Sequence, residues 1–494
     1  MNAYARLERR FARLQHLDDA LGILGWDKET TMPLGAAEAR GEQIATLSVM
    51  RHELICASEV ADWLDEADGD AGLDRMQAAN LREMRRDRAH AAGVPAELVE
   101  AASRASTRCE VAWRRARAES DFASLLPTLG EVLDTQRTVA QAKGEALGLA
   151  PYDALLDQYD PGLRAAAVEP VFGQLERELP ELLGAVLERQ RGMASPPPFR
   201  GPFPVAEQRA LGEELMRALG FDATRGRLDV STHPFCGGAT DDVRITTRYD
   251  EADFSSALMG VLHETGHALY EQNRPRALIA QPAGRARGMA MHESQSLLVE
   301  MQACRSEPFL RWLAGRLERR FGAQPAFAPD ALVAHYRTVR PGLIRVDADE
   351  VTYPAHIMLR FRLERAMIAG NLALPDLPAA FGDGMRTLLG VEVPDDRHGC
   401  LQDIHWPGGA WGYFPTYTLG AIMAAQLFGA AVAHDPAVVA ELADGRFGTL
   451  TTWLRRAIHE RGSTASSGEI LRDATGSDLD AGAFLSHLRS RYLD

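Results

Sequence analysis

The chain is poor in cysteine, and the cysteines it has are scattered. Five occur among 494 residues, and no two of them form a CxxC pair: Cys56, Cys109, Cys236, Cys304 and Cys400. This spacing suggests neither a disulfide framework nor a thiolate zinc site. Cysteines of this kind are typical of a protein from a reducing compartment.

The sequence also lacks a convincing secretory signal and a confident membrane span. Residues 1–15 carry charges throughout and contain no apolar core of the kind that signal peptides need. The most apolar segment, residues 419–432, is short for a span and contains Gln426. We therefore expect a buried helix there, no membrane partner, and a cytoplasmic location.

Positively charged residues are outnumbered by negatively charged ones, with 54 Lys and Arg against 69 Asp and Glu. The formal net charge is −15 and the sequence pI about 5.5, which argues against nucleic acid as the main partner. Hydrophobic residues make up 46% of the chain, enough for a large core. A chain of this length predicts either two or three domains or one two-lobed unit.

The pattern of apolar residues indicates a mostly helical protein. In the first quarter, apolar residues recur at steps of three and four, which places them on one helix face: Tyr4, Leu7, Phe11, Leu14, Leu17, Leu21 and Leu24. Prolines between residues 196 and 204 forbid a helix there. We interpret residues 1–494 as a single two-lobed unit with a lobe break near residues 191–205, although a long surface loop is an equal alternative.

One region has the character of β-strands. Leu228–Val230 and Val243–Thr247 flank Gly237 and Gly238, and alternation around a glycine turn predicts a β-hairpin. A strand edge beside the helix that follows could hold an extended peptide in register. A hairpin with a purely structural role fits the pattern equally well.

A metal-binding motif stands within the helix-like run from Phe254 to Gln272. His263 and His267 are four residues apart, so on a helix both imidazoles face the same way and can bind one metal ion. Glu264 beside them can act as general base on a metal-activated water. The alternative is a helix with two unrelated surface histidines, and the rest of the chain has to decide between the two.

A catalytic zinc ion needs a third protein ligand and one open position. A second helical segment, from Met289 to Cys304, offers candidates. Glu293 is the best of them, while spacing alone does not exclude His292 or Glu300. An ordinary solvated helix is again the alternative.

Several short motifs stand in order along the chain: His233-Pro234-Phe235 (HPF), Asp242 to Thr246 (D-x-R-x-T), His263 to His267 (H-E-x-x-H), His292 to Gln295 (HESQ), Ile344 to Asp349 (I-R-x-x-A-D) and Gly399 to Trp406 (G-x-x-Q-D-x-H-W). Trp26-Asp27 through Met32-Pro33 and Tyr152 to Leu156 belong with them. Each stretch is weak evidence alone, but together they span nearly the whole chain and resemble one family, the thermostable carboxypeptidases typified by carboxypeptidase Taq.

The resemblance implies a mostly α-helical, two-lobed fold with a deep substrate groove and a small β-hairpin or sheet near the metal, similar to neurolysin and angiotensin-converting enzyme. It implies a metallocarboxypeptidase that removes single C-terminal residues with broad specificity and usually refuses proline. The expected cofactor is one Zn²⁺ or Co²⁺ per chain, and a homodimer is typical. Carried over by motif, the metal ligands are His263, His267 and Glu293, and Glu264 is the base.

An exopeptidase must also recognise a free carboxylate, for which an arginine fork is the natural partner. Arg244 and Arg345 are the arginines of two of the motifs, and Arg345 could instead pair with Asp347 or Asp349. His233 is a further candidate for binding substrate at one end of the groove, unless it merely ends a strand.

Catalysis also requires hydrogen-bond donors for the developing oxyanion. His405 is one candidate, with a core histidine satisfied by Asp403 as the alternative. Tyr417 is preferred to Tyr413 as a phenolic donor, which leaves Tyr413 as a substrate-binding residue.

Two rival functions differ from the carboxypeptidase in what they need. A related oligoendopeptidase or dipeptidase would not need an arginine at the closed end of the groove. An inactive peptide-binding protein tends to lose the base or a ligand, whereas Glu264 and all three ligands are present here. The expected partners are therefore peptides with a free C-terminus.

Overall fold

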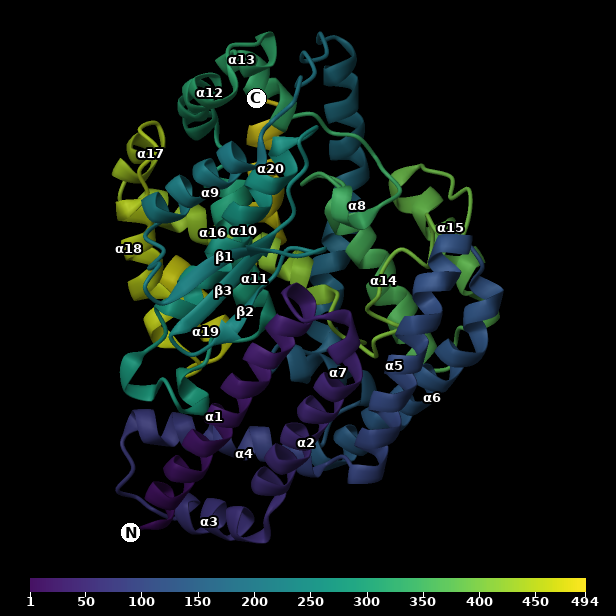
Figure 1. Ribbon diagram of the computed structural model, residues 1–494, viewed down its shortest axis with the longest axis vertical. Helices are drawn as coiled ribbons and strands as arrows, with labels where there is room; N and C mark the ends of the chain where they lie inside the picture. Colours follow the sequence, from purple (N-terminus) through teal and green to yellow (C-terminus); the bar gives the residue numbers. More distant parts are fainter.

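The computed structural model describes residues 1–494, with residue 34 described by its backbone alone. Helices dominate the described chain, and the sheet found in it has three short strands (Figure 1). The prediction of a mostly helical protein with a small β element is confirmed.

The N-terminal helices α1 to α4 form a body with a small hydrophobic core of its own, to which all four helices contribute (Figure 1, bottom). The apolar stripe predicted for the first quarter lies on α1, where Tyr4, Leu7, Phe11 and Leu14 are buried. The later leucines of that stripe are half-buried. The helices of this body are α1 (Ala3–Thr30), α2 (Ala37–Cys56), α3 (Ser58–Asp68) and α4 (Arg75–Ala92).

Five further helices lead to the sheet: α5 (Ala96–Glu119), α6 (Phe122–Leu147), α7 (Pro151–Tyr159), α8 (Ala165–Arg191) and α9 (Val205–Leu219). The proline-rich stretch is the connection between α8 and α9, as its composition predicted, and it contains no helix. A lobe boundary at this connection stays a prediction.

The sheet comprises β1 (Gly226–Val230), β2 (Cys236–Ala239) and β3 (Asp242–Thr247) in the order β1-β3-β2. The predicted hairpin was wrong in its pairing. β1 and β3 run parallel, and β3 forms its hairpin with β2, which contains Gly237 and Gly238. The chain turns instead at Asp241, whose φ is +60°. The glycine lies within a strand here and not in the turn. Gly238 has a φ of +100°, and a Cβ on it would lie 2.1 Å from the carbonyl oxygen of Asp242 on β3.

Two helices next to the sheet carry the chemistry. α10 (Phe254–Gln272) begins at Asp253, whose carboxylate accepts a hydrogen bond from the backbone N–H of Ser255 and so caps the helix. α11 (Met289–Leu297) continues into a π-helical turn, Leu298–Ala303. Such turns widen a helix locally and are common at functional sites.

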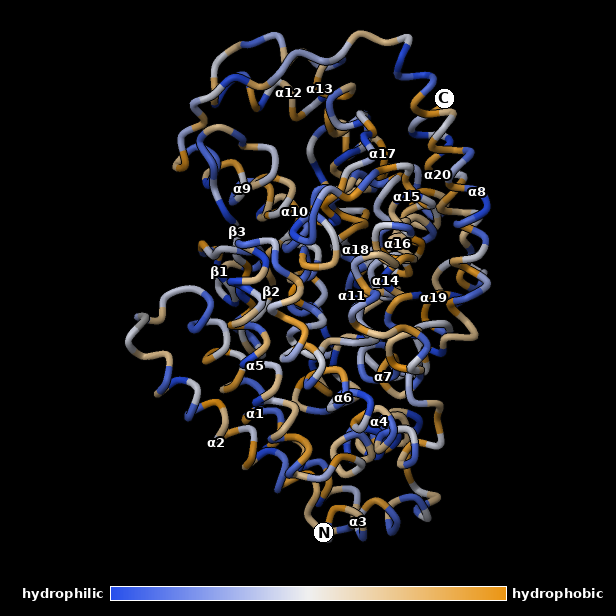
Figure 2. Tube along the Cα trace, turned by 90° about the vertical axis from the view of Figure 1, so that its right-hand side faces the viewer, coloured by the Kyte–Doolittle hydropathy of each residue, from blue (hydrophilic) through white to orange (hydrophobic). Residues whose placement is uncertain are grey.

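The remaining helices enclose these two, as Figure 1 shows: α12 (Glu307–Phe321), α13 (Pro329–Tyr336), α14 (Tyr353–Ile368), α15 (Leu377–Leu389), α16 (Pro415–His434), α17 (Ala437–Leu442), α18 (Gly448–Ala457), α19 (Ser467–Thr475) and α20 (Ala481–Tyr492). Hydrophobic positions gather along α14 and α16 in the interior (Figure 2). Residues of α11, α14, α16 and α20 belong to one large core.

The apolar segment of the sequence is α16, and it is long and apolar enough to cross a membrane by composition alone. In the structure it is a core helix. Leu419, Ile422 and Leu427 are at most 1% exposed, and Gln426 donates a hydrogen bond to the carbonyl of Asp478. The prediction of a buried helix is therefore confirmed.

Candidate active site

Three side chains from α10 and α11 converge as the sequence predicted. The ligand-type atoms of His263, His267 and Glu293 all lie within 4.8 Å of one another. Glu293 Oε2 is 3.2 Å from His267 Nε2 and 3.8 Å from His263 Nε2. Two imidazole nitrogens and a carboxylate oxygen are the donor set of catalytic zinc sites, so these residues fit a single divalent metal ion.

Two glycines allow this convergence. A Cβ on Gly266 of α10 would lie 2.4 Å from the carbonyl oxygen of Gln295 on α11, so only glycine permits the two helices to approach so closely. On the other side, a Cβ on Gly420 of α16 would lie 2.8 Å from Cβ of Glu293. Glu293 is thus held between two helices, facing the histidines.

The outer nitrogen of His263 has a carboxylate partner. Its Nδ1 lies 2.9 Å from Glu300 Oε2, and Arg305 donates to the other oxygen of Glu300 at 2.6 Å. Burial lowers the pKa of His263, but Glu293, Glu300 and Glu264 outweigh this effect and raise it to about 10. A carboxylate on Nδ1 holds one proton there, so Nε2, which faces Glu293, is the nitrogen that would give up its proton and bind a metal.

Glu300 and His292 were rivals of Glu293 for the third ligand position, and the structure places both one layer further out. Glu300 lies seven residues after Glu293 on the same helical face, where the π-helical turn brings it to His263. His292 lies on the far side of His267, with the two Nδ1 atoms 2.6 Å apart.

Glu264 is buried beside the histidines, and its side chain is 6% exposed. Burial raises its pKa to about 7, and Glu293 adds to the effect while His263 opposes it. Glu293, in contrast, has a pKa of about 2: burial raises it, but the histidines His263 and His267 lower it by more. Two carboxylates in one site are therefore tuned to different states, as a base and a ligand require.

A second group of residues, which we call the arginine wall, comprises Arg345, Arg360, Tyr353 and Asp403. Arg345 is buried, its Nε and Nη2 donate to Asp403 at 3.0 and 2.9 Å, and its Nη1 donates to the hydroxyl of Tyr353 at 2.9 Å. Arg360 of α14 donates to the other oxygen of Asp403 at 2.7 Å. Two guanidinium groups thus share one carboxylate. Neither Asp347 nor Asp349, the partners considered from the sequence, bonds to the side chain of Arg345.

Aromatic side chains join this wall to the metal-binding residues. His405 Nε2 lies 3.2 Å from the hydroxyl of Tyr417, and the guanidinium of Arg345 lies 5.1 Å from the centre of the Tyr417 ring. The rings of Tyr413 and Tyr417 are 5.2 Å apart. Burial raises the pKa of the phenols Tyr413, Tyr417 and Tyr353, and the negative charge of Glu293 adds to the effect in each.

Two predicted residues lie elsewhere. Arg244 forms an ion pair with Asp242 and its guanidinium lies 4.5 Å from the ring centre of Trp26 on α1, so its recorded contacts join α1 to the sheet. His233 is exposed in the connection between β1 and β2, and its carbonyl accepts a hydrogen bond from Ser231. Neither contacts the three ligand residues in the described structure.

Comparison with known proteins identifies the family. The family model of the carboxypeptidase Taq (M32) metallopeptidases matches residues 6–492. The chain belongs to this family. As a member of it, the M32 chain is a metallocarboxypeptidase, a hydrolase of peptide bonds. The resemblance seen in the sequence motifs is confirmed.

Relatives of the M32 chain are similar along their whole length. Thermostable carboxypeptidase 1 of Thermus thermophilus is 37% identical, with 96% of this chain and 95% of the relative covered. The solved structure of Trypanosoma cruzi metallocarboxypeptidase 1 is 41% identical, covers 100% of this chain and 99% of its own, and superimposes with a TM-score of 0.97. The M32 carboxypeptidase of Deinococcus radiodurans is 36% identical, with 99% and 98% of the two chains covered and a TM-score of 0.94.

The M32 chain contains site residues that the sequence argument did not select. Tyr353 and Arg360 belong to the arginine wall, and Glu271 lies behind the metal-binding histidines. Tyr353 and Arg360 lie seven apart on α14, so a search for polar residues on one face of that helix could have found them. Glu271 is four residues after His267 and thus shares its face of α10.

Proposed function

We propose that this protein releases single residues from the C-termini of peptides, with broad specificity, using one Zn²⁺ or Co²⁺ per chain bound by His263, His267 and Glu293. The convergence of these three side chains is the observation that carries the proposal. It gains support from relatives that are named carboxypeptidases.

We assign Glu264 as the general base. A divalent metal, when bound, supplies a Lewis acid that acidifies water and polarises the scissile carbonyl. Glu264 accepts the proton of the attacking water and later delivers it to the leaving amine. Its burial supports this role, because a carboxylate with a raised pKa holds and releases a proton near neutral pH more readily than an exposed one.

We assign stabilisation of the oxyanion to Tyr417, held by His405. Burial lowers the pKa of His405 to about 4, so its ring is neutral at neutral pH. We place the ring proton of His405 on Nε2, where it donates a hydrogen bond to the hydroxyl oxygen of Tyr417. The hydroxyl hydrogen of Tyr417 can then donate to the substrate. Burial raises the pKa of Tyr417 well above 10, which keeps that proton in place.

We propose that Arg345 binds the C-terminal carboxylate of the substrate and that Tyr413 is a further substrate-binding residue. A guanidinium has five N–H donors, and three of those on Arg345 are already used, which leaves one on each terminal nitrogen. Because Arg345 and Arg360 share a single Asp403, the wall has a surplus positive charge that suits an anion. Arg244 and His233 remain alternative substrate-binding residues, and they would act from the sheet rather than from this wall.

An arginine wall beside the metal-binding residues favours the carboxypeptidase over a related oligoendopeptidase or dipeptidase. The presence of Glu264 with all three ligand residues speaks against an inactive peptide-binding protein. We further propose that the protein acts as a cytoplasmic homodimer on peptides with a free C-terminus, without nucleic acid or a membrane. The acidic charge and the five free cysteines are consistent with this setting.

The test compares matched peptides that differ only at the C-terminus, one with a free carboxylate and one amidated, with products identified by mass. We expect stepwise loss of single residues from the free peptide alone, inhibition by a chelator, and recovery with zinc or cobalt. Internal cleavage of the amidated peptide would identify an endopeptidase instead.

The two arginines are separated by a parallel pair of variants. A charge-assisted hydrogen bond contributes about 1.5–3 kcal/mol, so Arg345→Ala should raise KM for the free peptide by roughly ten- to hundredfold. Arg244→Ala serves as the matched variant, and we expect its KM to stay near that of the wild type. The reverse result would assign the carboxylate to Arg244.

A further inference from the structure

The two metal-binding histidines have different surroundings on the side away from the ligand cluster. His263 meets a carboxylate, Glu300, directly. His267 meets a second imidazole, His292, and a carboxylate is reached only beyond that ring: His292 Nε2 lies 3.0 Å from Glu271 Oε1. Glu271 in turn pairs with Arg274, whose Nε is 3.2 Å from Oε2.

The direction of each hydrogen bond in this series can be worked out from its far end. An ionised carboxylate only accepts hydrogen bonds, so the Glu271 oxygen requires the ring proton of His292 to be on Nε2. A ring with its proton on Nε2 has a lone pair on Nδ1. A hydrogen bond between the two Nδ1 atoms, which lie 2.6 Å apart, then requires the Nδ1–H of His267 as its donor. With its proton on Nδ1, His267 presents a bare Nε2 to the ligand cluster.

We propose that His292 and Glu271 are positioning residues that set the tautomer of His267 and so prepare its Nε2 atom to bind the metal. This inference rests on the proposed metal site. It gives His292 of the HESQ stretch a role distinct from that of Glu293, its neighbour and a ligand. The partners beyond a metal ligand commonly change metal affinity when they are removed, by roughly 10–100-fold.

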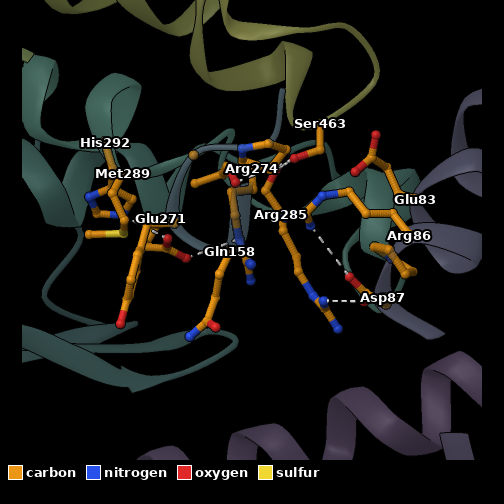
Figure 3. Close-up of a pocket in the computed structure, with 15 residues that line it drawn as sticks. Glu83, Arg86, Asp87, Gln158, Glu271, Arg274, Arg285, Met289, His292 and Ser463 are labelled. Carbon is orange, nitrogen blue, oxygen red and sulfur yellow. Dashed lines mark hydrogen bonds and ion pairs between the residues drawn. The ribbon is translucent and has the colours of Figure 1, made fainter. Parts of the chain in front are cut away.

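Glu271 and His292 lie beside a cavity, so substituting them does not create a void in the hydrophobic core. Glu271, Arg274 and His292 line a cavity of about 390 Å³ that also borders Arg285 and Asp87 (Figure 3). Glu271 and His292 are 26% and 15% exposed at their side chains. Substitutions there alter the wall of an open cavity.

Three variants distinguish the contact between His267 and His292 from the contact between His292 and Glu271. His292→Leu removes both hydrogen bonds. His292→Asn places an amide oxygen where Nδ1 was, so it keeps an acceptor for His267 and loses the link to Glu271. Glu271→Ala removes the carboxylate and leaves His292 in place. The matched control is His459→Asn, because His459 is a buried histidine of the same region whose Nε2 faces Gln295 Oε1 at 3.0 Å. Among the described residues it forms no hydrogen bond or ion pair with His263, His267 or Glu293.

The measurements are the dissociation constant for zinc, by competition with a chelator, and the visible spectrum of the cobalt-loaded protein, which reports ligand geometry. We expect His292→Leu to weaken zinc binding by roughly 10–100-fold and to change the cobalt spectrum. His292→Asn should lose less affinity. His459→Asn should keep both readouts, even if its unfolding temperature falls.

Unchanged affinity and an unchanged spectrum in His292→Leu would overturn the proposal. Should that variant not fold, the pair His292→Asn and Glu271→Ala decides: the double variant should bind zinc no more weakly than the weaker single variant, and additive losses would overturn the shared series. A failed metal site is recognised separately, because His267→Ala would then bind zinc as tightly as the wild type.

Discussion

At the scale of single residues, neighbouring carboxyl groups differ in pKa because their surroundings differ. Glu264 has no cationic partner at hydrogen-bond distance and its pKa is raised to about 7 by burial. Glu293 faces two imidazoles, and Glu300 is paired with Arg305, so both are held in the ionised state. Burial alone therefore does not predict the role of an acid, whereas the charge of its partner does.

Glu264→Gln should separate catalysis from metal binding. Because Gln has nearly the same shape but cannot accept a proton, kcat should fall by roughly 10²–10⁴-fold. Zinc content should stay at one ion per chain, since Glu264 is not a ligand in the proposed site. Steady-state kinetics and metal analysis of the same preparation check both statements. Wild-type turnover in this variant would remove Glu264 from the mechanism.

Glu364 of α14 is a buried acid outside the ligand cluster. It accepts hydrogen bonds from the Tyr152 hydroxyl at 2.8 Å, Trp406 Nε1 at 3.0 Å and the backbone N–H of Gly412 at 3.1 Å. Trp406 and Gly412 belong to the connection that carries His405 and Tyr413. Burial raises the pKa of Glu364 from 4.5 to about 7 despite these donors.

This pKa predicts a pH dependence of stability. A carboxyl group whose folded-state pKa is raised favours folding while protonated, so its contribution is lost as the pH rises from 4.5 to about 7. Glu364→Gln resembles the protonated form and does not titrate. Relative to the wild type, its free energy of unfolding should therefore improve by about 3 kcal/mol between pH 4.5 and pH 8. Urea unfolding of the metal-free proteins measures this, and a pH-independent difference would contradict it.

At the scale of elements, the site depends on how closely α11 approaches its two neighbours. Glu293 lies between α10 and α16, and the close contacts are made at Gly266 and Gly420. Glycine within a helix normally lowers its stability. At these two positions it allows α10 and α16 to approach α11 closely. The H-E-x-x-H pattern therefore contains, at its fourth position, a packing residue that ligand chemistry does not require.

Gly266→Ala tests this packing, with Gly260→Ala on the same helix as its control. A Cβ at residue 266 would meet the backbone of α11 at 2.4 Å, whereas at residue 260 the nearest atom is 3.7 Å away, an ordinary contact. Gly266→Ala should separate α10 from α11 and weaken zinc binding and activity at least tenfold. Gly260→Ala should leave zinc binding unchanged and gain up to about 1 kcal/mol of stability. Chelator competition and thermal unfolding distinguish the two, and equal behaviour of the variants would contradict the packing argument.

At the scale of the whole molecule, distant parts of the chain build one site. The ligand residues come from α10 and α11, the arginine wall from α14 and the segment before it, and the aromatic donors from the segment before α16 and its first turn. The N-terminal body contacts the sheet through Trp26, which lies against Arg244 and Arg227. A metal ion bound by His263, His267 and Glu293 would link α10 and α11, two helices that contribute to the large core.

Metal binding should stabilise the entire fold. A ligand that binds only the folded state, present at a thousandfold excess over its dissociation constant, adds about 4 kcal/mol to the free energy of unfolding. Thermal unfolding of the wild type should thus shift to higher temperature on addition of zinc. His267→Ala should show no such shift, since it lacks a ligand. An equal shift in this variant would mean that zinc binds elsewhere.

The sequence alone determined the helical class, the ligand motif and the family, because these depend on local spacing and on ordered motifs. His263 and His267 lie four apart on one helix, and no tertiary contact is needed to bring them together. Strand pairing was not determined in this way: the same alternating residues suit a hairpin or a parallel pair, and β1 joined β3 in parallel.

Only the tertiary structure decided among groups that compete for one role. Glu293, Glu300 and His292 lie on a single segment, and the ring nitrogen that each one faces distinguishes them. Glu293 lies near Nε2 of both imidazoles, whereas Glu300 faces Nδ1 of His263 and His292 faces Nδ1 of His267. Likewise, Arg345 and Arg244 are equivalent as motif arginines, yet one meets Asp403 and Tyr353 near the phenols and the other meets Asp242 and Trp26. Local spacing fixes which residues share a face, but which face meets the site depends on packing between elements far apart in the chain.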